Sequence, residues 1–275
     1  MRVRTNKKIP SGRVDDIAAL LSAARMSSQF LDHRTAFPHL QDLREAHDIQ
    51  CAAFALRHAP VAAYKIGLTN VDAQQAIGAG EPVAGRLAAD DLIRSPARIR
   101  APHHLRIVEA EIVFEIGKDL PGSSTPYARS DILSAISSVY AGIEICNSRF
   151  GPEDVSLLHL VADNSNADRL VLGDRLSGLR PVDLADLPVT LACEGRPVVS
   201  GSSARVLGDP VASVAWLANW LATCGEALKR GQFVASGSCT GVTEVDVGQT
   251  VVARFGEFGA AQAVFVPIED EETGL

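Results

Sequence analysis

The chain lacks the features that mark several large classes of protein. Its 275 residues hold five scattered cysteines, without any C-x-x-C or Cys/His spacing, which argues against a disulfide framework and a zinc site. The longest apolar helical stretch is far shorter than the roughly 20 residues that span a bilayer, and no hydrophobic signal core follows the basic N-terminus. Positive charge is not in excess, since the net charge is −7, which argues against a broad nucleic-acid footprint. We therefore expect a cytoplasmic protein with a small-molecule partner.

The sequence has two regions with different hydrophobic patterns. Apolar residues recur at helical spacing in Val14 to Ser28 and in His39 to His58, so the sequence predicts a helical N-terminal region over residues 1–60. Residues 61–268 alternate β-prone segments with Gly/Pro turns, which favours a mixed α+β body over a regular parallel sheet. The acidic residues 269–275 are expected to be disordered.

Within the body the sequence predicts nine strands and two helices. The expected strands are Ala63 to Gly67, Ile107 to Gly117, Gly142 to Cys146, Arg169 to Leu172, Val189 to Cys193, Gln232 to Ser236, Val242 to Val247, Thr250 to Phe255 and Ala261 to Phe265. The expected helices are Ser130 to Tyr140 and Val211 to Arg230.

Two carboxylates in one of these strands are the most informative feature. Glu109 and Glu111 lie two residues apart in an apolar run, and alternate side chains of a strand share a face. A carboxylate among apolar neighbours costs several kcal/mol unless it is paired, protonated or bound to a cation, and two neighbouring carboxylates also repel each other. A divalent metal would relieve both costs, whereas an edge strand with a solvated acidic face is the simpler alternative.

A third carboxylate, Glu144, is the only charge in the short apolar segment Ala141 to Cys146. Hard oxygen ligands select Mg²⁺, Mn²⁺ or Ca²⁺ over zinc, and three carboxylates leave coordination positions open for a substrate and water. The sequence therefore indicates a catalytic metal site. This hypothesis requires that the three carboxylates converge and that no lysine ammonium occupies their centre.

Five further residues are candidates for substrate contact or proton transfer. Each also has an ordinary structural explanation, because lysines at strand ends are often solvated and polar residues near glycine form turns. The candidates are Lys65, Asp90, Asp163, Asn164 and Ser236.

Seven motifs tie these candidates together, in an order that runs from about Lys65 to the end of the chain. As a set they resemble the 2-keto-4-pentenoate hydratase family, within the fumarylacetoacetate hydrolase superfamily. They are Lys65 to Thr69, Glu109 to Glu111 followed by Gly117 to Pro121, Ile143 to Phe150, Ala162 to Asn164, Leu207 to Pro210, Trp216 to Asn219 and Gly231 to Gly237.

The resemblance implies a fumarylacetoacetase-like β-roll behind a small helical N-terminal region, assembled as a homo-oligomer. It implies Mg²⁺ or Mn²⁺ on the three glutamates, chelated by a 2-oxo acid from aromatic catabolism whose enolate the metal stabilises. Lys65 would then offset the substrate charge, Asp90 would carry a proton, and Ser236 would lie beside the substrate carboxylate. Asp163 and Asn164 would complete the substrate contacts.

The sequence departs from the family pattern at the pocket walls. Asn147 replaces an aspartate or glycine, Asn166 to Asp168 replaces a serine-glycine pair, and the segment before Asp90 lacks a bulky phenylalanine. A hydratase is the expected activity. The alternatives are a decarboxylase of 2-oxo-dienoates, an acylpyruvate hydrolase with a histidine-activated water, and a keto-acid binder without activity.

Overall fold

A computed structural model describes residues 11–27, 30–37, 39–101, 106–123, 125–150 and 155–267. The acidic segment 269–275, predicted to be disordered, lies outside these residues. None of the described helices is both long enough and apolar enough to cross a membrane.

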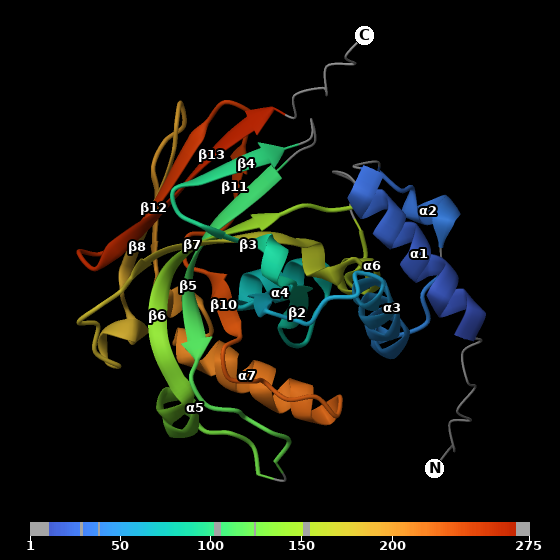
Figure 1. Cartoon of the computed structure of the whole chain (residues 1–275), viewed down its shortest axis with the longest axis horizontal. Coiled ribbons are helices and arrows are strands. Elements are labelled where there is room, and N and C mark those ends of the chain that lie inside the picture. The colour runs from blue at the N-terminus through green and yellow to red at the C-terminus, as the bar shows by residue number, and fades with distance from the viewer. Residues whose placement is uncertain are drawn as a thin grey trace.

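The N-terminal region is helical, as predicted. It contains α1 (Ser11–Ser27), α2 (His33–Ala36) and α3 (Leu43–Ala55), and these helices lie together on one side of the molecule in Figure 1. Asp42 caps α3 by accepting a hydrogen bond from the backbone N–H of Glu45, which satisfies one free donor of the first turn. Apolar residues of α1 and α3 pack with α6 (Leu157–Ala162) into a separate core cluster.

The body consists of two sheets. The larger has the order β2-β1-β10-β5-β6-β7-β3, and β11 pairs with β5 beyond this path. Its strands are β1 (Ala63–Gly67), β2 (Val83–Leu87), β3 (Leu92–Arg94), β5 (Arg106–Ile116), β6 (Ile136–Cys146), β7 (Ala167–Arg175), β10 (Phe233–Ser238) and β11 (Thr243–Val245).

The smaller sheet has the order β4-β13-β12-β8-β9 and packs on the larger one (Figure 1). Its strands are β4 (Ala97–Ala101), β8 (Pro188–Cys193), β9 (Val199–Ser202), β12 (Thr250–Phe255) and β13 (Gly259–Pro267). The main hydrophobic core contains side chains of both sheets, including Phe114, Ile143 and Phe265. The β5 side chains that point into it are the set opposite to Glu109 and Glu111, as the alternation predicted.

The remaining helices are short except α7 (Pro210–Thr223), which starts at Asp209 and has proline in its first turn. The others are α4 (Val71–Ile77), α5 (Arg129–Ala135), and the 3₁₀ segments η1 (Ala89–Asp91), η2 (Asn164–Asn166), η3 (Asp183–Ala185) and η4 (Ser203–Arg205). Two predicted helices were too long. The helix expected over Ser130 to Tyr140 ends at Ala135, because β6 begins there and pairs along β5, and α7 ends seven residues before Arg230.

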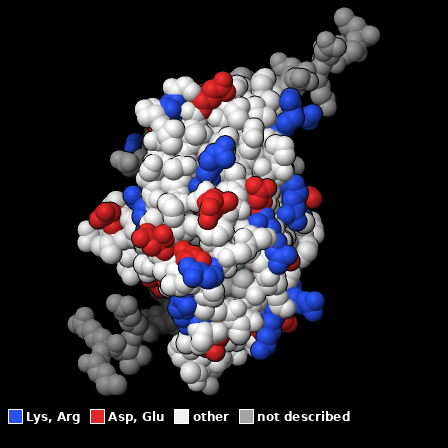
Figure 2. All heavy atoms as spheres, turned by 90° about the vertical axis from the view of Figure 1, so that its left-hand side faces the viewer, with Lys and Arg blue, Asp and Glu red and all other residues white. Residues whose placement is uncertain are grey.

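Charges of both signs are interspersed over the face of the molecule drawn in Figure 2. Uncharged atoms cover most of that face, and neither sign forms a continuous band across it.

An ionic contact fastens the N-terminal helices to the body. The carboxylate of Asp91, in η1, lies 3.0 Å from Arg25 of α1 and accepts two hydrogen bonds from Arg57. It also accepts a hydrogen bond of 2.8 Å from the backbone N–H of Ala88. The Asp91 side chain is 6% exposed and each arginine side chain 23%, so the pairs are largely shielded from water.

Replacing Asp91 should therefore destabilise the fold. Asp91→Asn removes the counter-charge of Arg57 and the nearer of the two carboxylates that pair with Arg25, and we expect the free energy of unfolding in urea to fall by about 2 kcal/mol. The exposed neighbour Asp90 supplies the matched control, because Asp90→Asn should leave the unfolding midpoint unchanged. Equal stability of the two variants would contradict an anchoring role for Asp91.

Candidate metal centre

Pairing of β5 with β6 brings two carboxylates face to face. In this antiparallel register Glu109 is directly opposite Glu144, Ile107 is opposite Cys146, and Glu111 is opposite Gly142. Directly opposite side chains lie about 5 Å apart at their Cβ atoms. The register therefore places Glu109, Glu144, Glu111 and Cys146 on one face of the sheet.

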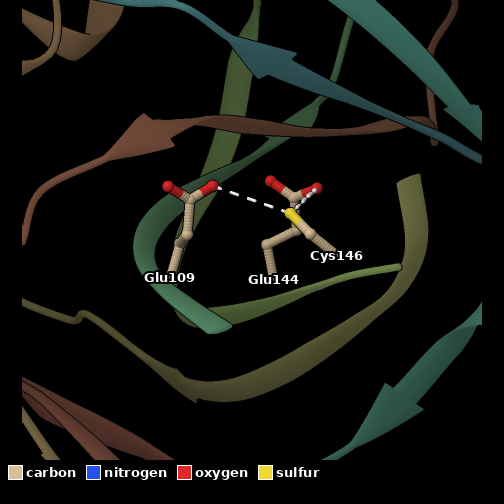
Figure 3. A group of neighbouring side chains, drawn as sticks. All are labelled: Glu109, Glu144 and Cys146. Atoms are coloured by element: carbon tan, nitrogen blue, oxygen red, sulfur yellow. Dashed lines mark hydrogen bonds between the residues drawn. The ribbon is translucent and has the colours of Figure 1, made fainter. Parts of the chain in front are cut away.

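Cys146 completes a compact group with two of the glutamates (Figure 3). Its Sγ atom lies 3.3 Å from Glu144 Oε1 and 3.7 Å from Glu109 Oε2. One donor atom of each residue lies within 4.8 Å of the others, a spacing at which they could hold one metal ion. The thiol stays protonated, because burial and the nearby Glu144 carboxylate raise the pKa of Cys146 well above its ordinary value.

Glu111 lies beside this group in a fully buried position. Its Oε2 accepts a hydrogen bond of 2.9 Å from the backbone N–H of Gly237, whereas its Oε1 has no partner. Gly237 has φ +120°, and a Cβ atom there would meet Thr69 Oγ1 at 2.4 Å, so only glycine allows this approach. The second oxygen of Glu144, Oε2, is also buried without a partner. Two unpartnered buried carboxylate oxygens are the chemistry that a cation would complete.

Lys65 is the cation that the protein itself supplies. Strand β1 pairs in parallel with β10, and Lys65 Nζ lies 3.0 Å from Glu144 Oε1 and 4.0 Å from Cys146 Sγ. Burial by itself lowers the pKa of Lys65, but the surrounding acidic groups outweigh this effect and raise it, so the amine stays protonated. Among the described residues Lys65 makes no second ion pair. Glu144 is thus the carboxylate that it contacts, while Glu109 and Glu111 also act on its charge.

The pKa values of Glu109 and Glu111 show how costly the cluster is. Burial raises both, and repulsion from Glu144 raises both further, with the larger rise at Glu111. A single ammonium does not balance three carboxylates. A divalent ion fits this donor set, because hard oxygens are the ligands that Mg²⁺ and Mn²⁺ prefer and the extra positive charge relieves the repulsion.

A cavity of about 380 Å³ opens beside the carboxylates, within the range of roughly 300–1,000 Å³ for small-molecule sites. Its polar wall includes Lys65, Glu109 and Cys146, and apolar residues such as Leu68, Val83, Ile107 and Leu160 form the rest.

One wall of the cavity is a strained corner of the backbone. Asn164, Ser165 and Asn166 have φ values of +56°, +54° and +59°, a run that non-glycine residues rarely adopt. Side chains hold the corner on β2: the amide of Asn164 bonds both backbone groups of Arg86, at 2.8 Å each, and Ser165 donates to Ala84 O at 3.0 Å. Ser165 and Asn166 line the cavity.

The predicted substrate-contact residues divide between the cavity and other places. Lys65 lines it. Ser236 is fully buried, and its hydroxyl has no hydrogen-bond partner among the described residues, whereas Ser238 lines the cavity. Asp163 is bound to Arg149, whose backbone N–H donates to it at 2.8 Å, and Asn164 is bound to Arg86. Contacts of these three residues with a ligand stay predictions.

Asp90 does not come near the carboxylates. It is exposed and borders a different cavity, together with Arg98, Arg100 and Arg169. The geometry gives no support to a role for Asp90 in proton transfer at Glu109, and that role stays a prediction.

Sequence reasoning missed two residues of the site. Cys146 had a usable signal, because it lies two residues after Glu144 on a strand and so shares its face. Arg205 had none, since it comes from η4, at the end of the smaller sheet.

Comparison with known proteins gives consistent results. The family model of the fumarylacetoacetate hydrolase C-terminal domain matches residues 60–266. A 2-keto-4-pentenoate hydratase of Paraburkholderia xenovorans (strain LB400) is 30% identical, over 93% of this chain and 96% of that protein. A 4-oxalocrotonate decarboxylase of Pseudomonas putida is 32% identical, over 74% of this chain and 76% of that protein.

A solved structure has the same fold over nearly the whole chain. The 4-oxalocrotonate decarboxylase from Pseudomonas putida G7, complexed with magnesium and adipate, superposes with a TM-score of 0.85 at 26% identity, covering 95% of this chain and all of that one. The same enzyme was also solved with calcium and acetate. The predicted α+β fold with a helical N-terminal region is thereby confirmed.

The raised pKa of Glu111 leads to a test of stability. Without metal, the folded protein holds protons that the unfolded chain releases above the ordinary value of 4.5, so stability falls as the pH rises past that value. Glu111→Gln removes this cost. We expect its unfolding free energy at pH 7 in a chelator to exceed that of the unmodified protein by about 1–2 kcal/mol, with the gain vanishing toward pH 4.

Addition of Mn²⁺ should make the unmodified protein the more stable of the two, because the variant lacks one ligand and gains less stability from the metal. Glu115→Gln on the same strand is the control, since Glu115 lies outside the cluster and bonds Tyr140 instead. A less stable metal-free Glu111→Gln protein with an undiminished response to Mn²⁺ would contradict the proposed role of Glu111.

Proposed function

The chain belongs to the fumarylacetoacetate hydrolase family, and from this premise we propose that it is a divalent-metal-dependent hydratase. In this proposal it adds water to a 2-hydroxy-dienoate or 2-keto-enoate from aromatic catabolism, as a 2-keto-4-pentenoate hydratase does. The observation that carries the proposal is the pair of opposed carboxylates, Glu109 and Glu144, at a cavity of ligand size. Homo-oligomeric assembly and a cytoplasmic location belong to the same proposal.

Glu109, Glu111 and Glu144 would hold the metal, and we propose Mg²⁺ or Mn²⁺ because the donors are hard oxygens. When bound, the ion would supply Lewis-acid stabilisation of negative charge on the oxo-acid oxygens. The unpartnered oxygens of Glu111 and Glu144 support this assignment, because they are buried and no described residue donates a hydrogen bond to them.

Lys65 has a role that follows from its own environment. Without metal, its raised pKa keeps the proton on Nζ, so Lys65 then serves as a positive charge and not as a general base. It acts as a fixed positive charge in a shielded position, which favours an anionic substrate and the further negative charge that develops during enolisation. The apolar wall formed by Leu68, Val83 and Ile107 limits competing water around that charge.

A decarboxylase of 2-oxo-dienoates is the second candidate, because relatives of that name match the chain about as well as the hydratases do. The same metal and lysine chemistry serves both reactions. The acylpyruvate hydrolase is less favoured. It needs a histidine-activated water, and no histidine is found among the described residues that line the cavity.

A panel of 2-oxo and 2-hydroxy-dienoic acids, with and without Mg²⁺ or Mn²⁺, decides between these activities. Loss of ultraviolet absorbance without released CO₂ identifies water addition, and absorbance change with released CO₂ identifies decarboxylation. Tight binding of the acids without any product would establish a binding protein instead.

Removal of one metal ligand tests the proposal further. Glu109→Gln should lower both the affinity for Mn²⁺ and kcat/KM at least about 100-fold, because even residues that only support a ligand contribute up to that much. Metal affinity is measured by calorimetry, and Glu115→Gln serves as the control on the same strand. Turnover that is unchanged by the Glu109 substitution in metal-depleted buffer would overturn the metal assignment.

Asp90 is tested by the same assay. As a proton carrier it would cause a large loss of kcat in Asp90→Asn, whereas its exposed position at another cavity leads us to expect kcat within about twofold of the unmodified enzyme. A loss of about 100-fold or more without a change in metal affinity would establish the proton-transfer role after all.

A further inference from the structure

We propose that Arg205 recognises a second carboxylate on the substrate, so that the preferred substrate is a dicarboxylic 2-oxo or 2-hydroxy-dienoic acid. This inference rests on the proposed function, because it takes the metal end of the cavity as the site of the oxo-acid group. It adds the chemical class of the other end of the substrate.

Arg205 is brought to the cavity by packing of the smaller sheet on the larger one. It ends η4, which follows β9 directly. Gly201 of β9 lies so close to the backbone carbonyl of Cys239 that a Cβ atom there would come within 2.0 Å of it. The next residues are also held, since the N–H of Leu207 donates to Thr69 O at 2.8 Å. Backbone contacts on both sides of Arg205 therefore fix its position at the rim.

The guanidinium group of Arg205 lies near Gly241, another residue of the cavity wall. Its Nη2 lies 3.9 Å from the position that a Cβ atom of Gly241 would occupy, and Gly241 and Val242 line the cavity with it. Because Gly241 has no side chain, no Cβ atom stands at this position beside the guanidinium.

The cations on the cavity wall differ in whether a protein carboxylate balances their charge. The ionisable groups on its wall are Lys65, Glu109, Cys146 and Arg205. Lys65 is paired with Glu144 at 3.0 Å. Among the described residues Arg205 has neither an ion pair nor a hydrogen bond to a carboxylate, Glu109 included. It is thus the one cavity cation in that part of the chain whose charge is not already balanced by a protein carboxylate.

A substrate with anionic groups at both ends fits this arrangement. One end belongs at the carboxylate cluster, where a metal and Lys65 supply positive charge. The other end meets Arg205, whose planar fork matches a carboxylate with two parallel hydrogen bonds. The cavity lining also includes Ile107 and Val242, which are apolar and suit a hydrocarbon chain. A monocarboxylic acid would leave Arg205 without a partner.

Two saturated acids of equal length isolate this contact from turnover. 2-Oxoadipate and 2-oxohexanoate share the oxo-acid group and differ only in the distal carboxylate, and neither carries the double bond that hydration requires. Calorimetry of the Mn²⁺-loaded protein should show about tenfold tighter binding of the diacid, the gain expected for a charge-assisted hydrogen bond. Arg205→Gln should abolish this preference and leave the affinity for the monoacid within about twofold.

Arg98→Gln is the matched control. Arg98 is an exposed arginine at a different cavity, and its substitution removes the same net charge. It should leave the preference intact. Equal affinity of the unmodified protein for both acids, or equal weakening of both by Arg205→Gln, would overturn the inference. Failure of both acids to bind would overturn the proposed oxo-acid site itself, and the inference with it. A diacid preference without turnover of any dienoate would defeat only the hydratase assignment.

Discussion

The antiparallel register of β5 with β6 is the constraint on which the site depends. It sets Glu109 opposite Glu144 and brings Glu111 and Cys146 to the same face. A shift of either strand by one residue would turn its two members of this group into the core and move its apolar set outward. The core therefore constrains the site: with Phe114 and Ile143 buried between the sheets, Glu109 and Glu144 must lie on the opposite face.

The rest of the fold supplies what this strand pair lacks. Strand β10 brings the N–H of Gly237 to Glu111, β1 brings the ammonium of Lys65, and the end of the smaller sheet brings Arg205. These groups come from different parts of the sequence, so one small cavity requires residues that lie far apart in the chain.

The sequence predicted the centre of the site better than its surroundings. Alternation along β5 was enough to place Glu109 and Glu111 on one face, and the strands at Ala63 to Gly67 and Thr250 to Phe255 were correct to the residue. The first half of β6 was taken for a helix, because Ile136 to Tyr140 continues the helical spacing of α5 and only pairing with β5 decides its state. The positions of Asp90 and Arg205 relative to the cavity depend on how distant segments pack. The local spacing of residues does not determine that packing.

The salt bridge between Lys65 and Glu144 bears on the order in which the mature protein is assembled. In metal-dependent miniature domains the apoprotein is unfolded, because only the ion holds the ligands together. Here the lysine supplies a built-in counter-ion during biogenesis, and the large core between the sheets does not involve the carboxylates. The polypeptide can thus reach its native state through this core alone, and on the proposed metal assignment it would acquire its ion afterwards, from whatever divalent pool surrounds it.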